Sequence, residues 1–286
     1  MTKVWLILID ILVAFFLILS FILFYLNVTQ KEIIVPPKDQ NITIGPLSLP
    51  ELDLNDTITL DDLIRTGEQS DTEEEYFTES IIKTRTLKEG LVALSAKVGD
   101  PVFIRIFKDE SLLEVWIHTG TVYEHLKDYA ICAYSGHLGP KLKEGDKQAP
   151  EGFYRVEKYQ LNPKSKFHLS FNLGYPNAYD RARKRTGSFL MVHGNCVSIG
   201  CYAMTDEKIE EIYALVESAL DNGQKQVQVH AYPFMMTDEN MAFYEGNEWY
   251  DFWANLKEGY DYFETEKLPP HIKVKNRRYE VHEAKE

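Results

Sequence analysis

Cysteine is scarce in this chain, which has only three among 286 residues, at positions 132, 196 and 201. Three cysteines cannot all pair with one another, so at least one is free or bonded outside the chain. Basic residues are also in the minority, 31 against 44 acidic ones, and the net charge is −13. This balance gives no reason to expect a nucleic acid as partner. No internal repeat or low-complexity block is visible after residue 80, so that part is expected to form one globular domain.

A single long apolar run, VWLILIDILVAFFLILSFILFYL, occupies residues 4–26. At about 1.5 Å per residue, a helix of this length can cross a hydrocarbon layer of about 30 Å. Bulky residues follow the run where a signal peptidase requires small ones, which favours an uncleaved signal anchor over a cleaved signal peptide. We therefore expect residues 1–30 to form a short cytoplasmic tip and a single transmembrane signal anchor, with the remainder of the chain outside the cytoplasm.

Residues 31–79 have a different composition from the rest of the chain. They contain 13 acidic and three basic residues, so they account for most of the net charge, and prolines are concentrated in their first half. Like charges and few aromatic residues leave little surface to bury. We predict an acidic flexible linker here, with an acidic docking tail as the alternative.

The folded part reads as a mainly β domain with attached helices, an α+β fold. A hairpin is predicted from alternating apolar and polar residues at 101–108 and 112–120. Residues 206–223 place apolar side chains on one helical face, with Thr205 or Asp206 as the cap. Further strands are predicted at 129–134, 152–156, 167–174, 188–194 and 226–234, and helical segments at 81–98 and 249–262.

The segment HGNCVSIGCY, residues 193–202, contains two of the three cysteines and allows three interpretations. As a metal site, His193, Cys196 and Cys201 supply three ligands, and a structural zinc site normally has four. His230 or Cys132 could complete the set in space, but nothing in the spacing requires it, so no metal is expected. A Cys196–Cys201 disulfide would close only a small loop and gain little from it. The third interpretation is a cysteine nucleophile with a neighbouring imidazole as base, and glycine beside it so that backbone amides can face an oxyanion.

Other candidates have plainer interpretations. Cys196 is expected to be a buried small side chain, and Cys132 to lie in the core of the strand at 129–134. Arg181 and Arg183 could present guanidinium groups to a substrate carboxylate, or form a solvated basic loop. Five histidines are expected to be surface or capping residues: His118, His125, His137, His168 and His230.

The segment resembles the motif of the YkuD-type L,D-transpeptidase catalytic domain. The first half, Met191-Val192-His193-Gly194, is similar to its His-Gly strand end, and Ser198-Ile199-Gly200-Cys201 to its Ser-x-Gly-Cys. Upstream, Tyr134-Ser135-Gly136 and Ala149–Tyr154 are similar to two further motifs of the family. The match extends over roughly residues 85–280 and is closest to the YafK-like branch. Ile199 stands where many members have a second histidine, which favours different acceptor chemistry.

The resemblance implies a YkuD-like β-sandwich or barrel, with a catalytic domain at 80–235 and an aromatic-rich C-terminal extension, 236–286, packed on it. It assigns Cys201 as nucleophile, His193 as general base and the Gly194 carbonyl as the group that orients the imidazole. It also assigns contacts with the oxyanion and the substrate to Ser198, Gly200 and Tyr202. No cofactor is expected.

The implied substrate is a peptidoglycan stem peptide, attacked at its diamino acid to give a thioester, in the periplasm beside the inner membrane. Hydrolysis of the amide that joins peptidoglycan to a lipoprotein lysine is the leading expectation. Transpeptidation, by 3–3 cross-linking or lipoprotein attachment, is the first alternative, and a non-catalytic peptidoglycan-binding or redox-sensing module is the second.

Overall fold

The computed structural model describes residues 86–284. The predicted anchor and acidic linker therefore lie outside the described residues. Within residues 86–284, no helix combines the length and the apolar character that crossing a membrane requires. The elements in chain order are α4 (Leu87–Ala93), β1 (Val102–Phe107), β2 (Leu112–His118), β3 (Tyr123–Ala130), β4 (Ala133–Tyr134), β5 (Gly152–Val156), η1 (Lys158–Gln160), β6 (Leu161–Ser165), β7 (His168–Asn172), α5 (Ala178–Ala182), β8 (Met191–His193), β9 (Tyr202–Ala203), α6 (Asp206–Asp221), β10 (Val227–Tyr232), α7 (Asp238–Phe243), α8 (Tyr250–Glu266), β11 (His271–Lys275) and β12 (Arg278–His282).

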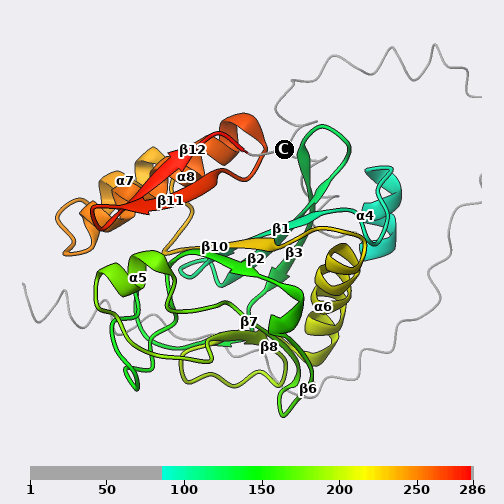
Figure 1. The fold of residues 1–286 in the computed structure, drawn as a ribbon, viewed down its shortest axis with the longest axis horizontal. Coiled ribbons are helices and arrows are strands. Elements are labelled where there is room, and N and C mark those ends of the chain that lie inside the picture. Colours follow the sequence, from blue (N-terminus) through cyan, green and yellow to red (C-terminus); the bar gives the residue numbers. More distant parts are fainter. Residues whose placement is uncertain (1–85, 285–286) are drawn as a thin grey trace, which may run out of the picture. The chain divides into compact units, whose positions relative to one another are not determined.

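Two five-stranded sheets form the body of the described part (Figure 1). The first has the order β3-β2-β1-β10-β5, and the second has the order β4-β9-β8-β7-β6. The predicted hairpin is confirmed, since β1 and β2 pair antiparallel from Val102 opposite Ile117 to Phe107 opposite Leu112. β1 also pairs parallel with β10.

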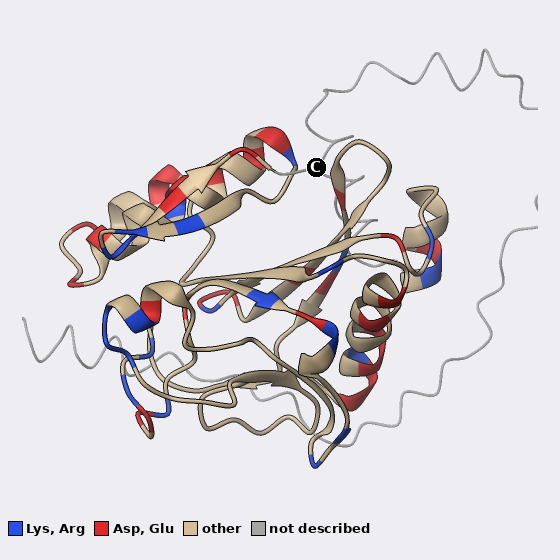
Figure 2. Ribbon diagram, in the orientation of Figure 1, with Lys and Arg blue, Asp and Glu red and all other residues tan. Residues whose placement is uncertain are grey.

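One apolar core joins the two sheets to helix α6. It contains Ile104 and Val229 from the first sheet, Val192 from the second, and Ile212 and Val216 from α6, all almost inaccessible to solvent. The predicted helix at 206–223 is confirmed, and its buried positions repeat every three or four residues. Figure 2 shows that acidic residues recur along α6. The chain thus has the mixed α+β architecture predicted from the sequence.

The second face of the first sheet is covered by the C-terminal segments α7, α8 and the β11–β12 hairpin (Figure 1). Trp253 and Leu256 of α8 and Tyr279 of β12 pack with Phe107 and Tyr232 of the sheet. The helical segment predicted at 249–262 is confirmed as α8, while the β11–β12 hairpin was not predicted. The boundary between catalytic domain and extension stays a prediction.

This cover explains why β1 is buried on both faces, contrary to its alternating sequence pattern. Arg105 is only 4% exposed. Its guanidinium pairs with Glu114 at 2.7 Å and with Glu264 of α8 at 2.5 Å, and lies over the ring of Trp116. A buried charge needs such partners, and α8 supplies one that local periodicity cannot indicate.

The strand predicted at 129–134 is interrupted, which changes the environment of Cys132. β3 ends at Ala130 and β4 begins at Ala133, so Cys132 lies in the break and is exposed. The prediction of a core position for Cys132 is therefore wrong. The prediction of a surface or capping position is also wrong for His230, which is fully buried between the rings of Phe103 and Phe153.

Candidate active site

The register of β8 and β9 brings His193 and Cys201 to one face of the second sheet. Val192 pairs with Tyr202 in a parallel arrangement, and both belong to the core. Because successive residues of a strand point to opposite faces, the residues beside this pair, His193 and Cys201, point away from the core. Diagonal neighbours on one sheet face lie roughly 7–8 Å apart, within reach of long side chains. The register therefore places His193 and Cys201 as diagonal neighbours on one face of the sheet.

The imidazole of His193 is held in one tautomer. Its Nδ1 lies 2.6 Å from the carbonyl oxygen of Gly194, which can only accept, so Nδ1 carries the proton. The Nε2 atom is then left with a lone pair for a proton from a nucleophile. The ring also packs against Phe167, with centroids 4.7 Å apart, and only 2% of the residue is exposed. These contacts match the orienting role that the resemblance assigns to Gly194.

Gly194 itself lies where no side chain fits. A Cβ atom at this position would lie 2.6 Å from Asp206 Oδ1 and 3.0 Å from the carbonyl oxygen of Phe167. The amide of Gly194 donates to the carbonyls of Phe167 and Leu169. The close approach of the α6 N-terminus to the β8 end therefore requires glycine.

Gly194→Ala is expected to lower stability by about 1–3 kcal/mol, the usual cost of overpacking, and to lower kcat by displacing the carbonyl that orients His193. Thermal unfolding and steady-state kinetics check both effects. Gly223→Ala is the control, because Gly223 has φ +106 with no atom near its Cβ position and lies at the far end of α6. It should lose stability through backbone strain but keep kcat. Equal kcat for both variants would contradict the orienting role of Gly194.

Ser198 organises the turn before Cys201. Its Oγ accepts from the amides of Gly200 at 3.2 Å and Cys201 at 3.1 Å, and donates to the Cys201 carbonyl at 2.8 Å. The φ of Gly200 is +137, which only glycine adopts readily. An oxyanion would have to compete with this hydroxyl for the two amides. Tyr202 is fully buried, and its hydroxyl donates to the Pro150 carbonyl, so its side chain does not face a substrate.

Cys201 is 9% exposed, and its thiol donates to the Phe189 carbonyl at 3.7 Å. Burial raises the pKa of this thiol above its ordinary value, although a hydrogen bond from the Met191 backbone and the positive charge of Lys141 act in the opposite direction. Burial also lowers the pKa of His193, while its bond to Gly194 opposes the shift. Both shifts favour a neutral thiol and a neutral imidazole in the resting site. Lys141 was not predicted from the sequence, where nothing marks it.

These shifts predict the pH dependence of the site. A general base works only when unprotonated, so kcat/KM should fall on the acidic side through a pKa below about 6.5, the ordinary value for histidine. Alkylation of Cys201 by iodoacetamide, which needs the thiolate, should rise through a midpoint above about 8.5. Rate measurements from pH 5 to 10 check both. An alkylation midpoint below neutrality would mean a thiolate–imidazolium pair and would contradict this account.

The other two cysteines form a disulfide that was not predicted. Cys132 and Cys196 are bonded, with their Cα atoms 5.3 Å apart, and Cys201 remains free. The predicted burial of Cys196 is wrong, since the residue is exposed, and the alternative Cys196–Cys201 disulfide is also wrong. Because a half-cystine offers no thiolate, Cys196 cannot complete a metal site with His193. The three-cysteine count was compatible with this pairing but did not indicate it.

Arg181 and Arg183 lie on and just after α5, where Figure 2 shows several basic residues. Arg183 donates to the carbonyl of Arg277 in the β11–β12 turn, at 3.2 and 2.9 Å, and Arg181 donates to the Pro176 carbonyl. Their described hydrogen bonds therefore go to backbone groups away from Cys201. The structure does not bring these two arginines together with the cysteine and the histidine.

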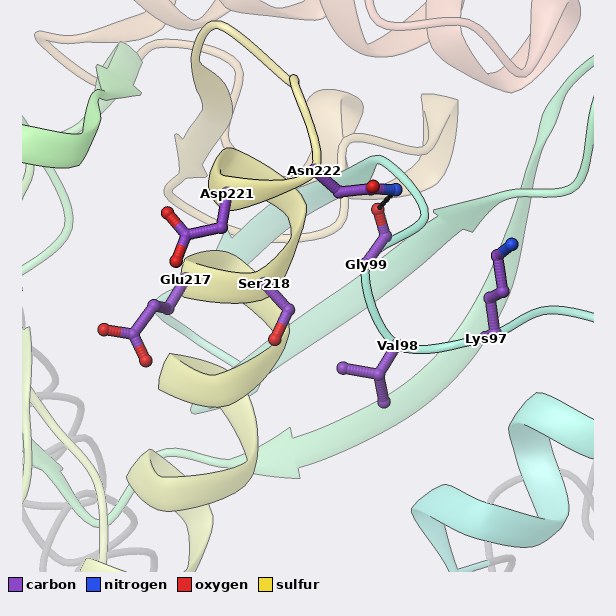
Figure 3. A pocket seen from close by; sticks show the side chains of 7 residues that line it. All are labelled: Lys97, Val98, Gly99, Glu217, Ser218, Asp221 and Asn222. Atoms are coloured by element: carbon purple, nitrogen blue, oxygen red, sulfur yellow. Dashed lines mark hydrogen bonds between the residues drawn. The ribbon is translucent and has the colours of Figure 1, made fainter.

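Two other features of the described part lie apart from Cys201. Glu114, His125 and Asp128 are close enough to hold a metal ion, but Glu114 already accepts from Arg105 and Trp116, and His125 pairs with Asp128 at 2.6 Å. The hollow in Figure 3 lies between the end of α6 and the loop before β1, and contains none of the predicted site residues.

Comparisons with known proteins agree with this arrangement. Residues 101–230 match the YkuD family model, the L,D-transpeptidase catalytic domain. The chain is 52% identical over 184 residues to the Escherichia coli K12 protein named "Putative L,D-transpeptidase YafK", with 64% of this chain and 75% of that protein covered.

Two solved structures are more distant. The helical cell shape determining protein Pgp2 from Campylobacter jejuni is 18% identical with a TM-score of 0.37, over 67% of this chain and 81% of that one. Bd1075 of Bdellovibrio bacteriovorus is 16% identical with a TM-score of 0.34, over 64% and 82%. Both scores are low and add nothing to the assignment. On the family match and the shared sequence, this chain belongs to the YkuD family of L,D-transpeptidases, cell-wall enzymes that act on peptidoglycan, and to its YafK-like branch.

Proposed function

We propose that this protein is a cysteine amidase that hydrolyses the amide between a peptidoglycan stem peptide and a lipoprotein lysine. The observation that carries the proposal is that the strand register places the free thiol of Cys201 at the start of the strand next to His193, whose imidazole has its Nδ1–H fixed on Gly194. A free thiol beside an oriented base is the arrangement that thioester chemistry needs.

In the first half of the reaction, Cys201 Sγ attacks the carbonyl on the L-centre of the diamino acid. His193 Nε2 takes the thiol proton and returns it to the departing lysine amine, so that the C–N bond breaks as the thioester forms. In the second half, water attacks the thioester with His193 as base, which releases a free carboxylate and restores the thiol. An amine in place of this water would give transpeptidation with the same residues.

The surface beside Cys201 favours a polypeptide as leaving group over a second polar stem peptide. Phe189, Val197 and Ile199 are 73%, 53% and 81% exposed, respectively. They lie within a few residues of the thiol or of the carbonyl that it contacts. Stem peptides are rich in charge and gain little from apolar contacts, whereas apolar side chains flanking a lysine gain from them. Ile199 also replaces the second histidine that the family motif suggests.

We also propose that the enzyme works in the periplasm, anchored in the inner membrane by residues 4–26. The length of the apolar run supports this placement. Cell fractionation, with protease treatment of spheroplasts to establish which side the domain faces, tests it. Degradation of the domain only in lysed spheroplasts would contradict a periplasmic location.

The function is tested with the purified full-length chain beside its Cys201→Ala variant. Each is incubated with a muropeptide that carries a lysine-peptide on its diamino acid, and separately with a plain tetrapeptide muropeptide. Mass spectrometry then identifies the products. Cysteine-dependent release of the stem tripeptide from the lysine adduct is the expected result.

Other outcomes assign the chain differently. Loss of the terminal D-residue of the tetrapeptide with formation of a new cross-link would make the protein a transpeptidase. If neither substrate changed and no thioester mass appeared on Cys201, the catalytic proposal would fail and a peptidoglycan-binding or redox-sensing module would replace it.

A further inference from the structure

The Cys132–Cys196 disulfide links two segments that each bond to the backbone just after Cys201. The amide of Cys132 donates to the Ala203 carbonyl at 2.9 Å, and the amide of Cys196 donates to the Met204 carbonyl at 3.1 Å. The two half-cystines are thus attached to consecutive carbonyls, two and three residues after Cys201, and the S–S bond joins them. A covalent link across 64 residues of chain therefore connects the β3–β4 junction to the loop that leads from base to nucleophile.

This loop, residues 194–201, is also anchored at its start, where the amide of Gly194 donates to the carbonyls of Phe167 and Leu169. Asn195 also donates its amide to Asp206 Oδ1 at 2.7 Å. The bonds of Ser198 to Gly200 and Cys201 stay within the loop, and its Oγ contact with Ser135 leaves it. Val197 and Ile199 are exposed, so the loop has little apolar packing of its own. Asn195 and Cys196 both have positive φ, at 66° and 46°, which residues other than glycine rarely adopt. Cys196, one of the two half-cystines, is therefore itself in an unusual backbone conformation.

The link reaches the nucleophile through two serines. Ser135 follows Cys132 by three residues and Ser198 follows Cys196 by two, and their Oγ atoms are 3.5 Å apart. Ser198 Oγ in turn holds the amide of Cys201. Fixing the two half-cystines relative to each other therefore fixes the turn that presents the thiol.

We propose that Cys132 and Cys196 are positioning residues of the active site, and that the enzyme is competent only with their disulfide intact. The disulfide keeps the 194–201 loop in the conformation that places Cys201 opposite His193. It also leaves Cys201 as the single thiol available for acyl transfer. This inference rests on the proposed function for its kinetic consequences but not for its effect on Cys201.

The test uses the full-length chain, purified without reductant, and its Cys132→Ser/Cys196→Ser double variant, in which Cys201 stays the only thiol. Native wild type is expected to take up one iodoacetamide label per chain. Displacement of reacting groups by about 1 Å costs about 10²-fold in rate, so kcat of the double variant should fall by about this factor with little change in KM. Both enzymes are assayed well below their unfolding temperatures, so that a loss of stability alone does not lower kcat.

Alkylation of Cys201 provides a readout that a merely structural role would not change. Loosening the loop should expose the Cys201 thiol, so that alkylation is faster. The pH midpoint of alkylation should also move down toward about 8.5, the ordinary pKa of cysteine. Cys201→Ser serves as the control that must take up no label. This measurement needs no substrate, so it still decides the question if wild type turns over neither muropeptide and the proposed amidase function fails.

If the double variant does not fold, wild type is treated with dithiothreitol instead. The dithiol gives two electrons and two protons to the S–S bond, yields two cysteine thiols and becomes its own cyclic disulfide. Three labels per chain, a faster reaction at Cys201 and recovery on reoxidation would support the proposal. Wild-type kcat and an unchanged alkylation profile without the disulfide, or a fully active native enzyme that takes up three labels, would overturn it.

Discussion

Replacing Cys201 by alanine is expected to lower kcat on the lysine-linked muropeptide by about 10⁴- to 10⁶-fold, the range seen when a nucleophile is removed. The loss should be near its maximum, because the other two cysteines of the chain are bonded to each other and offer no substitute thiol. Steady-state kinetics measures the loss. Mass spectrometry of the intact protein should show a thioester adduct on wild type and none on the variant.

The unfolding temperature separates chemistry from folding in this experiment. Cys201→Ser keeps nearly the same volume and should unfold close to the wild-type temperature while remaining almost inactive. If Cys201→Ala kept turnover close to that of wild type, another group would have to be the nucleophile, and the roles given to His193 and Gly194 would have to be reassigned with it.

Lys108→Met is expected to destabilise the protein by about 3–5 kcal/mol, the cost of breaking a buried ion pair. Lys108 and Glu151 are both completely buried, with Nζ 2.8 Å from Oε1. The Lys108 ammonium also contacts the carbonyls of His137, Gly139 and Ala149. Its removal leaves the Glu151 carboxylate and these carbonyls without a cation. Thermal unfolding should show a fall on the order of 10 °C.

The same substitution should also lower activity, because the ion pair holds a wall of the site. Glu151 Oε1 accepts from the amide of Gly139, and its Oε2 accepts from Trp253 of α8. The segment between Gly139 and Glu151 passes beside Gly200, whose Cβ position would lie 3.6 Å from the Gln148 carbonyl. Trp253 of α8 therefore holds Glu151, and through it the segment that lies beside Gly200.

Lys158→Met is the matched control for Lys108→Met. Lys158 pairs with Asp221 on the surface, where their side chains are 70% and 50% exposed. Exposed pairs contribute about 0–1 kcal/mol, so the control should barely change the unfolding temperature. Equal losses for the two variants would contradict the structural importance of the buried pair.

Local patterns predicted the elements that depend on local interactions. The β1–β2 hairpin and helix α6 follow from alternation and from a period of three to four residues, and both are present. Arg105 shows where such patterns fail. A charged residue in an alternating strand ordinarily faces solvent, but α8, far later in the chain, covers that face and supplies Glu264. No window of sequence around Arg105 contains that information.

The cysteines show the same limit at the site. Their number required an odd thiol, and the His-Gly and Ser-x-Gly-Cys motifs assigned that role to Cys201. The partner of Cys196 depends on the interruption between β3 and β4, which places Cys132 outside both strands. It also depends on the hydrogen bond from the Cys132 amide to the Ala203 carbonyl, which brings Cys132 close to Cys196. A disulfide forms only between cysteines whose Cα atoms approach within about 7 Å, which is a property of the fold.

By itself, then, the sequence determined the family, because its motifs lie within one segment of nine residues, 193–201. It also determined the α+β class, because strands and helices follow from local periodicity. Only the tertiary structure decided the Cys132–Cys196 bond and the buried Lys108–Glu151 pair. Each of these depends on groups that are brought together from distant parts of the chain, where desolvation makes every charge and every polar atom depend on one particular partner.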